Sequence, residues 1–308
     1  MDFRTELKIQ PSGLDLDYSD KISMIGSCFA DNIGRILEDH RLPVKFNSHG
    51  ILFNPASIYK ALHDTLTCKK YTIEELRKFE GKYVSMNHHG RFSDPDPSTV
   101  LKKINDSIET ALEHLKTSKV LFITFGSAFA WKQKSTDTVV ANCHKIPQIE
   151  FEKTLLEHAE IVSSFTPLFH QLRNINPDLQ IVLTVSPVRY FRDGVVANNL
   201  SKSNLLIACH TLSKENRVHY FPAFEWVIDD LRDYRFFKED MVHPNDQAIR
   251  YIWEKFLDWA MNKEVINKIK QVGQLNRGLH HLPQPGNSAD EHARKQAILA
   301  EIEEIIRS

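Results

Sequence analysis

The chain has 308 residues, of which 42% are hydrophobic and 26% charged. This is enough to bury a sizeable core as one large domain or two small ones. Its formal net charge of -1 gives no general electrostatic reason to bind nucleic acid or an anionic membrane, so we expect neither partner.

Residues 1–20 are polar and rich in turn formers, which predicts an arm on the surface. Residues 21–25 then form a short run with β-branched side chains, which predicts a strand. The apolar residues that follow recur at helical spacing as far as about His40, so the period changes from strand to helix across Gly26 and Ser27. Ser27 is therefore expected on a tight strand-to-helix turn.

A second, short strand is expected over residues 43–46, followed by an insertion at about residues 47–97 that lacks a regular alternation of strand and helix. Within the insertion we predict helices over 56–66 and 72–79, and a hairpin that joins 82–86 to 91–93. Insertions of this length are more often functional than neutral, which indicates a lid or a wall of a binding site.

From Pro97 the alternation of helices and strands resumes. The spacing predicts a helix over 97–115, a buried strand over 120–125, an irregular connection over 126–148 and a helix over 151–173 kinked near Pro167. A strand over 181–185, a helix over 195–213, a strand over 218–221 and a helix from about Pro244 are expected to follow. Alternating helices and strands are typical of a parallel sheet, and right-handed crossovers place helices on both of its faces. We therefore expect an α/β fold, a three-layer α/β/α sandwich around a five-stranded parallel sheet.

We predict one domain over residues 1–265 and a C-terminal helical tail over residues 266–308, with a linker at 282–286. The N-terminus lacks a signal-peptide pattern, and no apolar run approaches the ~18 residues of a membrane span, so we expect a cytoplasmic protein. Four scattered cysteines without a C-x-x-C pair favour reduced thiols over a disulfide framework or a structural zinc site; they are Cys28, Cys68, Cys143 and Cys209.

Reactive residues follow the first and the last predicted strand. Residues that share a site in a parallel sheet gather at the carboxyl ends of its strands, and the amides of a helix N-terminus beside Ser27 suit a developing oxyanion. Asp240 and His243, three residues apart, suit a carboxylate that orients an imidazole, and Pro244 favours a position for His243 just outside the helix. We predict Ser27 as nucleophile, His243 as general base and then acid, and Asp240 as the residue that fixes the imidazole tautomer.

Other interpretations of these residues stay open. Ser27 has the pattern of a simple helix N-cap, and Cys28 at a helix N-terminus is an alternative nucleophile. Three rival orienters are interpreted as solvated or capping residues; they are Asp229, Asp230 and Asp233. The irregular spacing of His88, His89 and His144 does not favour a metal site, so we expect no metal.

Several stretches together resemble one known family. Gly26-Ser27-Cys28-Phe29-Ala30 resembles the motif for which the GSCFA family is named, and that family is similar to a branch of the SGNH (GDSL-like) hydrolases. The other matching stretches are Phe46-Asn47, 50–55, 124–128, 140–145, 186–189 and 240–244. Together they extend over about residues 20–260.

The resemblance implies a flavodoxin-like SGNH hydrolase fold, a Ser-Asp-His triad and an oxyanion hole with three donors. Ser27 and Gly50 fit the first two donors, the amides of the serine and of a glycine after the second strand. The third, an asparagine after the third strand, has no direct match, because no Asn follows Gly126; Asn142 is the best candidate. We expect substrate contacts from Asn47, His89, Gly126, His144, Lys145 and Arg189, the basic side chains among them suiting an anionic group.

The leading hypothesis is a cofactor-free serine hydrolase that cleaves a small acyl ester through an acyl-enzyme, with an O-acetyl or other acyl group on a carbohydrate as one possible substrate. Two alternatives use the same fold: an acyltransferase that acts on a saccharide with the same triad, and a non-catalytic carbohydrate- or ligand-binding module. The sequence does not indicate the oligomeric state.

Overall fold

The computed structural model describes residues 4–280 and 289–307. Its central sheet has five parallel strands in the order β10-β9-β5-β1-β2. They are β1 (Lys21–Gly26), β2 (Val44–Phe46), β5 (Ser118–Phe125), β9 (Gln180–Val185) and β10 (Val218–Tyr220). Counted along the chain this is the order 2-1-3-4-5 of flavodoxin-like sheets, so the predicted fold class is confirmed.

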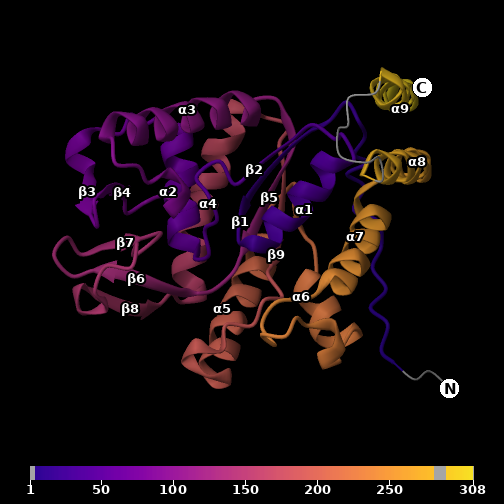
Figure 1. Ribbon diagram of the computed structural model, residues 1–308. Coiled ribbons are helices and arrows are strands. Elements are labelled where there is room, and N and C mark those ends of the chain that lie inside the picture. The colour runs from indigo at the N-terminus through magenta and orange to yellow at the C-terminus, as the bar shows by residue number, and fades with distance from the viewer. Residues whose placement is uncertain (1–3, 281–288, 308) are drawn as a thin grey trace.

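Helices cover both faces of this sheet (Figure 1). One face packs against α1 (Cys28–Asp39), α7 (Asp246–Ala260) and α8 (Lys263–His280); the other packs against α2 (Pro55–Leu66), α4 (His158–Ile175) and α5 (Val195–Leu212). Strand β5 shows the alternation, since Val120 and Phe122 belong to the first core, and Leu121 and Ile123 to the second. The central strands of the sheet are thus covered by an apolar core on each face.

The N-terminal arm is less superficial than predicted. Leu14 and Leu16 are buried in the first core, and the amides of Ser12 and Leu16 donate to the carbonyls of Trp259 and Ala260. The arm therefore packs along the end of α7.

The insertion was predicted correctly at α2 and wrongly after it. Instead of a helix over 72–79, a 3-10 turn (Ile73–Glu75) leads into β3 (Leu76–Phe79), which pairs antiparallel with β4 (Lys82–Ser85). The two residues between them, Glu80 and Gly81, both have positive φ, the geometry that closes a two-residue hairpin. Residues 91–93 are not the partner of 82–86, because Gly90–Phe92 is a 3-10 turn before α3 (Pro97–Leu115).

The connection over 126–148 contains strands that the sequence did not indicate. β6 (Phe129–Gln133) pairs antiparallel with both β7 (Thr138–Val140) and β8 (Phe151–Leu155). The helix predicted from residue 151 therefore begins only at His158, where Glu157 and Glu160 form a capping box.

The C-terminal part is helical as far as it is described. α6 (Ala223–Glu225) follows the last strand, and α7 begins after the N-cap Asn245, two residues beyond Pro244. α8 spans the expected boundary between residues 265 and 266, and α9 (Ala289–Arg307) packs beside it, so the division into domain and tail stays a proposal. The expected linker at 282–286 lies outside the described residues. Among these helices, as far as they are described, none is long and apolar enough to cross a membrane.

Candidate active site

Ser27 lies at the turn between β1 and α1, at the carboxyl edge of the sheet. It is fully buried with extended backbone angles, and its Oγ accepts a hydrogen bond of 3.3 Å from the Phe29 amide. The preceding Gly26 has φ +139°, and its amide donates to the Asn47 side chain at 2.9 Å. Ser27 is therefore the N-cap of α1, whatever else it does.

Asp240 and His243 form a hydrogen-bonded pair in the loop before α7. His243 Nδ1 lies 2.7 Å from Asp240 Oδ2, while Asp240 Oδ1 accepts from the amides of Val242 and His243 at 2.9 and 3.0 Å. These hydrogen bonds lower the pKa of Asp240 to about 2, and the bond from the His243 amide contributes most. An ionised carboxylate only accepts, so Nδ1 is the donor of this hydrogen bond, which leaves Nε2 as the ring nitrogen available to another partner.

The pair and the serine are linked through the loop after β9. The Arg189 amide donates to the Val242 carbonyl at 3.1 Å, and the Tyr190 hydroxyl is hydrogen-bonded to the Cys28 thiol. Within residues 4–280 and 289–307, however, no hydrogen bond joins Ser27 to His243. The His243 side chain is also 41% exposed, whereas Ser27 is 0% exposed.

Cys28 begins α1 beside the serine. Burial raises the pKa of its thiol, although the hydrogen bond from Tyr190 and the nearby Lys202 act in the opposite direction. A protonated thiol is a weak nucleophile, so the structure disfavours Cys28 as the attacking group.

The two backbone amides expected as oxyanion donors already have acceptors. The Ser27 amide donates to the Thr124 carbonyl at 3.2 Å and the Gly50 amide to the Asn47 carbonyl at 2.7 Å. The side-chain oxygen of Asn142 accepts from the His144 amide, and in the described chain no hydrogen bond joins Asn142 to Ser27. Gly126 does lie against the serine, since a Cβ added to it would be 3.2 Å from the Ser27 Cβ.

The expected substrate contacts divide into buried and accessible groups. Asn47 is fully buried and supports Gly26. His89 packs over Gly50, where an added Cβ would lie 2.1 Å from the His89 Cβ, and His144 Nε2 donates to the Ser85 carbonyl at 2.7 Å. Burial lowers the pKa of both histidines, which favours neutral rings.

Two basic residues of this group are more open. Lys145 is exposed. Arg189 lies over the Phe191 ring at 4.9 Å and lines a groove of about 280 Å³ with Tyr234 and Phe237. The Arg189 amide also donates to the Val242 carbonyl, so Arg189 lies next to the loop that carries His243.

Three polar residues on α5 were missed by the sequence interpretation. Asn198 accepts from the Tyr190 amide at 3.0 Å, Ser201 accepts from the Ala128 amide at 2.7 Å, and Lys202 donates to two strand-end carbonyls. A signal existed, since these residues and Leu205 follow the i, i+3, i+4, i+7 spacing of a buried helix face.

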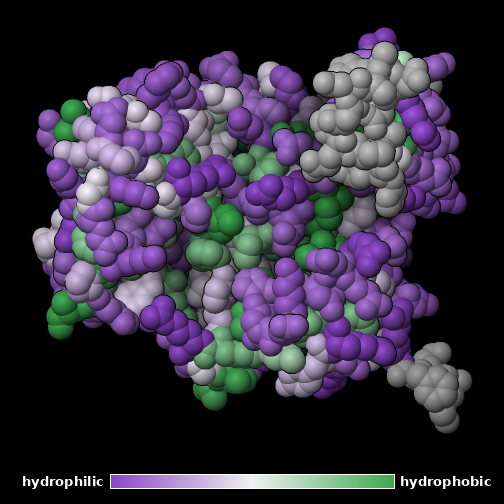
Figure 2. Space-filling model, viewed as in Figure 1, coloured by the Kyte–Doolittle hydropathy of each residue, from purple (hydrophilic) through white to green (hydrophobic). Residues whose placement is uncertain are grey.

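The outward face of α5 is correspondingly apolar. Val196 is 84% exposed and Leu200 52% exposed, and hydrophobic surface appears along the lower edge of the molecule where α5 lies (Figure 2). The first turns of α5 are thus polar inside and apolar outside, the reverse of an ordinary surface helix.

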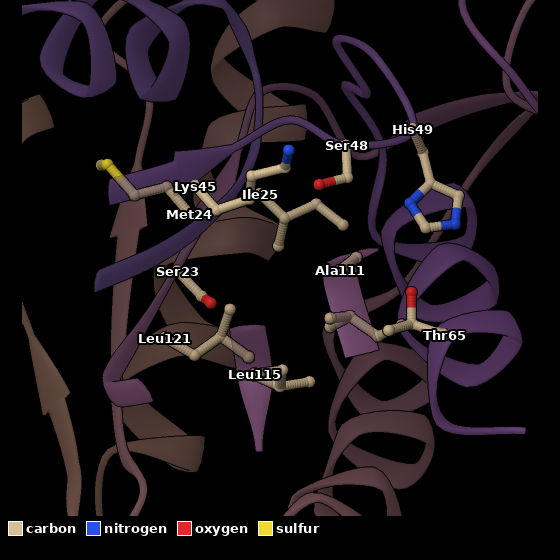
Figure 3. A pocket seen from close by; sticks show the side chains of 11 residues that line it. Ser23, Met24, Ile25, Lys45, Ser48, His49, Thr65, Ala111, Leu115 and Leu121 are labelled. Atoms are coloured by element: carbon tan, nitrogen blue, oxygen red, sulfur yellow. The ribbon is translucent and has the colours of Figure 1, made fainter. Parts of the chain in front are cut away.

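A small cavity lies between β1 and the helices α2 and α3, away from this edge (Figure 3). Its polar lining includes Ser23, Ser48, His49 and Thr65, and its volume of about 30 Å³ has room for a water molecule. Ser27, Asp240 and His243 do not line it. Among the described residues, no group of three or more His, Cys, Asp or Glu side chains is arranged to hold a metal ion.

Comparison with known proteins identifies one family and several distant structures. A model of the GSCFA family matches residues 21–256. No curated protein matches the sequence.

Three solved structures are similar to the chain. An acetyl xylan esterase from the rumen bacterium Butyrivibrio proteoclasticus is 10% identical with a TM-score of 0.40, over 79% of this chain and 63% of that one. A family two carbohydrate esterase from Clostridium thermocellum, in complex with cellohexaose, is 10% identical with a TM-score of 0.34, over 87% and 66%. A family 3 carbohydrate esterase from Clostridium thermocellum is 11% identical with a TM-score of 0.31, over 82% and 98%. The chain thus spans less than two thirds of the first two structures.

Proposed function

The chain belongs to the GSCFA family, and on that premise we propose that it is a serine hydrolase of the SGNH type that cleaves a small acyl ester. The observation that carries the proposal is the 2.7 Å hydrogen bond between His243 Nδ1 and Asp240 Oδ2. The loop that holds this pair is hydrogen-bonded to the loop after β9, which lies beside the Ser27 turn. A base oriented by a carboxylate next to a strand-end serine is the requirement for acyl transfer.

In the proposed reaction, His243 Nε2 removes the proton from Ser27 Oγ, which attacks the carbonyl carbon of the ester. The tetrahedral oxyanion collapses, the alcohol leaves with the proton from His243, and Ser27 keeps the acyl group. Water, deprotonated by His243, then attacks the acyl-enzyme and releases the acid. The serine hydroxyl must first turn from the Phe29 amide toward His243, because it now caps α1.

We retain Ser27, Gly50 and Asn142 as proposed oxyanion donors, with the first two amides exchanging their present carbonyl acceptors for the substrate oxygen. The proposed contacts of the acyl and alcohol parts remain Asn47, His89, Gly126, His144, Lys145 and Arg189. An acetylated saccharide is the first substrate to screen.

The test combines an activity-based fluorophosphonate probe with mass-spectrometric mapping of the labelled residue. Wild type should be labelled at Ser27 and should hydrolyse a 4-nitrophenyl acyl ester. Ser27→Ala should lose labelling and roughly 10³-fold or more in kcat. The matched variant Cys28→Ala should keep both. Equal hydrolysis by wild type and Ser27→Ala would overturn the mechanism.

A second function, ligand binding without catalysis, is favoured by one observation: Ser27 is fully buried and its hydroxyl already serves the helix cap. It would be supported if wild type resisted the fluorophosphonate yet bound saccharides in calorimetry. Acyl transfer is separated from hydrolysis by adding a saccharide acceptor and comparing acylated product with free acid.

A further inference from the structure

Lys202 is a buried lysine that joins the ends of two central strands. It is 2% exposed, and its Nζ donates to the carbonyl oxygens of Gly126 and Ser186, both at 2.6 Å. Gly126 directly follows β5 and Ser186 directly follows β9. One ammonium group on α5 therefore fixes both loops at the edge where the serine lies.

The same group lies behind the Ser27 turn. Gly126, which accepts from Lys202, packs against Ser27, and Lys202 is close enough to Cys28 for each to affect the pKa of the other. No carboxylate within residues 4–280 or 289–307 forms an ion pair with Lys202. Its third N–H likewise has no hydrogen-bond acceptor in that part of the chain.

A buried positive charge without a counter-ion is costly, and it suits a site where negative charge appears transiently. Fixed charges and dipoles that need no reorganisation stabilise a developing oxyanion most effectively in a water-poor environment. The two carbonyls of Gly126 and Ser186 solvate the ammonium group but do not neutralise it.

We propose that Lys202 is a positioning residue of the Ser27 site, which holds the loops after β5 and β9 in place and whose positive charge stabilises the negative charge that develops at the serine turn. This inference rests on the proposed hydrolase function. The inference adds the requirement that Lys202 be protonated during the reaction.

The surroundings of Lys202 make this requirement measurable. Burial lowers the pKa of Lys202 to about 7. The groups that face it are Cys28 on α1, Arg189 in the loop after β9, and the Phe224 ring on α6 at 5.9 Å. Tyr190 in the same loop contacts Cys28. Burial raises the pKa of Cys28 and of Tyr190, so neither thiol nor phenol ionises near pH 7, and the Arg189 charge lowers the pKa of Lys202.

On α6, Glu225 is engaged with the Tyr220 hydroxyl at 2.8 Å. A decline of activity just above pH 7 would therefore report Lys202.

The test measures kcat, KM and the rate of fluorophosphonate labelling from pH 6 to pH 9.5 in wild type, Lys202→Met, Lys202→Arg and Ser201→Ala. Wild type should lose kcat/KM above about pH 7 as Lys202 releases its proton. Lys202→Met should lose roughly 10- to 100-fold in kcat with little change in KM, and its profile should lack that decline. Lys202→Arg should recover part of kcat and hold it at pH 9.

Ser201→Ala is the structural control, because it loosens the same helix face from the loop after β5 without removing a charge. A lower rate of hydrolysis in Ser201→Ala is compatible with the proposal, but the decline of kcat/KM above pH 7 should remain. If Lys202→Met and Ser201→Ala give the same pH profile, the electrostatic role is wrong. If Lys202→Met does not fold, the wild-type profile decides, and a labelling rate that does not fall above pH 7 overturns the proposal.

The two proposals fail in different ways. A wild type that neither hydrolyses esters nor reacts with the probe overturns the hydrolase, and the role of Lys202 with it. A reactive wild type whose rate is unaffected by Lys202→Met leaves the hydrolase standing and removes Lys202 alone.

Discussion

Asp240 is ionised at neutral pH, and the loop that folds back on it lowers its pKa further. Two backbone amides and the His243 ring all donate to one carboxylate, so three bonds hold the orientation of the imidazole. At the half-exposed position of this pair, water competes for the same groups, and the loop geometry rather than burial keeps the ring in place.

Asp240→Asn should lower kcat by roughly 10²- to 10⁴-fold while the protein stays folded. An amide oxygen still accepts from the Val242 and His243 amides, but the amide no longer stabilises the imidazolium or fixes the tautomer. Stopped assays of ester hydrolysis and circular dichroism measure the two effects. Asp229→Asn, a rival orienter, is the matched variant and should keep the wild-type rate; the reverse result would move the orienter to Asp229.

Lys202 should also set a pH dependence of stability. Burial lowers its folded pKa from 10.5 to about 7, so between pH 7 and 10.5 the unfolded chain binds a proton that the folded chain does not. Stability that depends on this group therefore rises with pH through that window and is lowest below pH 7.

The free energy of unfolding of wild type minus that of Lys202→Met should accordingly increase by about 1 kcal/mol per pH unit between pH 7 and 10. Urea unfolding at pH 7, 8.5 and 10 measures the difference, in which groups common to both proteins cancel. A difference that stays constant with pH would show that the folded Lys202 keeps an ordinary pKa.

At the scale of elements, the turn from β1 to α1 depends on Gly26. Its φ of +139° is one that L side chains rarely adopt, and an added Cβ would lie 2.1 Å from the Thr124 carbonyl oxygen on the neighbouring strand. The glycine lets β1 and β5 stay paired up to the serine.

Gly26→Ala should therefore destabilise the protein by about 3 kcal/mol or more, from steric overlap and backbone strain together. Gly13→Ala is the matched control: Gly13 also has positive φ, +73°, but nothing lies within 4 Å of an added Cβ. It should cost about 1 kcal/mol, from strain alone. Urea unfolding compares them, and equal losses would contradict the role assigned to the Thr124 contact.

The elements that the sequence predicted well are those with long or uninterrupted apolar patterns. β5 and β9 are continuous apolar runs, and α3 keeps its helical spacing through Ile104 and Ile108. The short strands β3, β6 and β7 have few buried residues, so they show no recognisable alternation of apolar and polar side chains. In β8, Phe151 and Leu155 lie four residues apart, which gave a helical spacing to a segment that pairs with β6.

The candidate site shows the same limit at shorter range. Ser27, Asp240 and His243 could be proposed from the sequence because each carries a local signal, a strand-helix turn or a three-residue spacing. Lys202 was missed because its partners, Gly126 and Ser186, are distant in sequence and bond through backbone carbonyls. The direction of the Gly50 amide is likewise a property of backbone torsions, which the sequence does not specify.

At the scale of the whole molecule, α8 packs into the same core as α1 and α7. Val265 and Ile269 are buried at 6% and 1% exposure in the core that also contains α1 and α7. Gly273 packs close to His40 at the end of α1. A helix that fills the first core should unfold with the sheet in one transition.

Ile269→Ala should therefore lower the free energy of unfolding of the whole protein by about 2 to 5 kcal/mol, because it leaves a cavity in that core. The same substitution at Ile73, which is 51% exposed in the insertion, should cost no more than about 0.5 kcal/mol. Urea unfolding followed by tryptophan fluorescence and by far-UV circular dichroism should give coincident curves in wild type and in both variants. If residues after 265 formed an independent unit, Ile269→Ala would shift only part of the circular dichroism signal and leave the fluorescence transition in place. Coincident curves that move together assign α8 to the same cooperative unit as the sheet that carries Ser27.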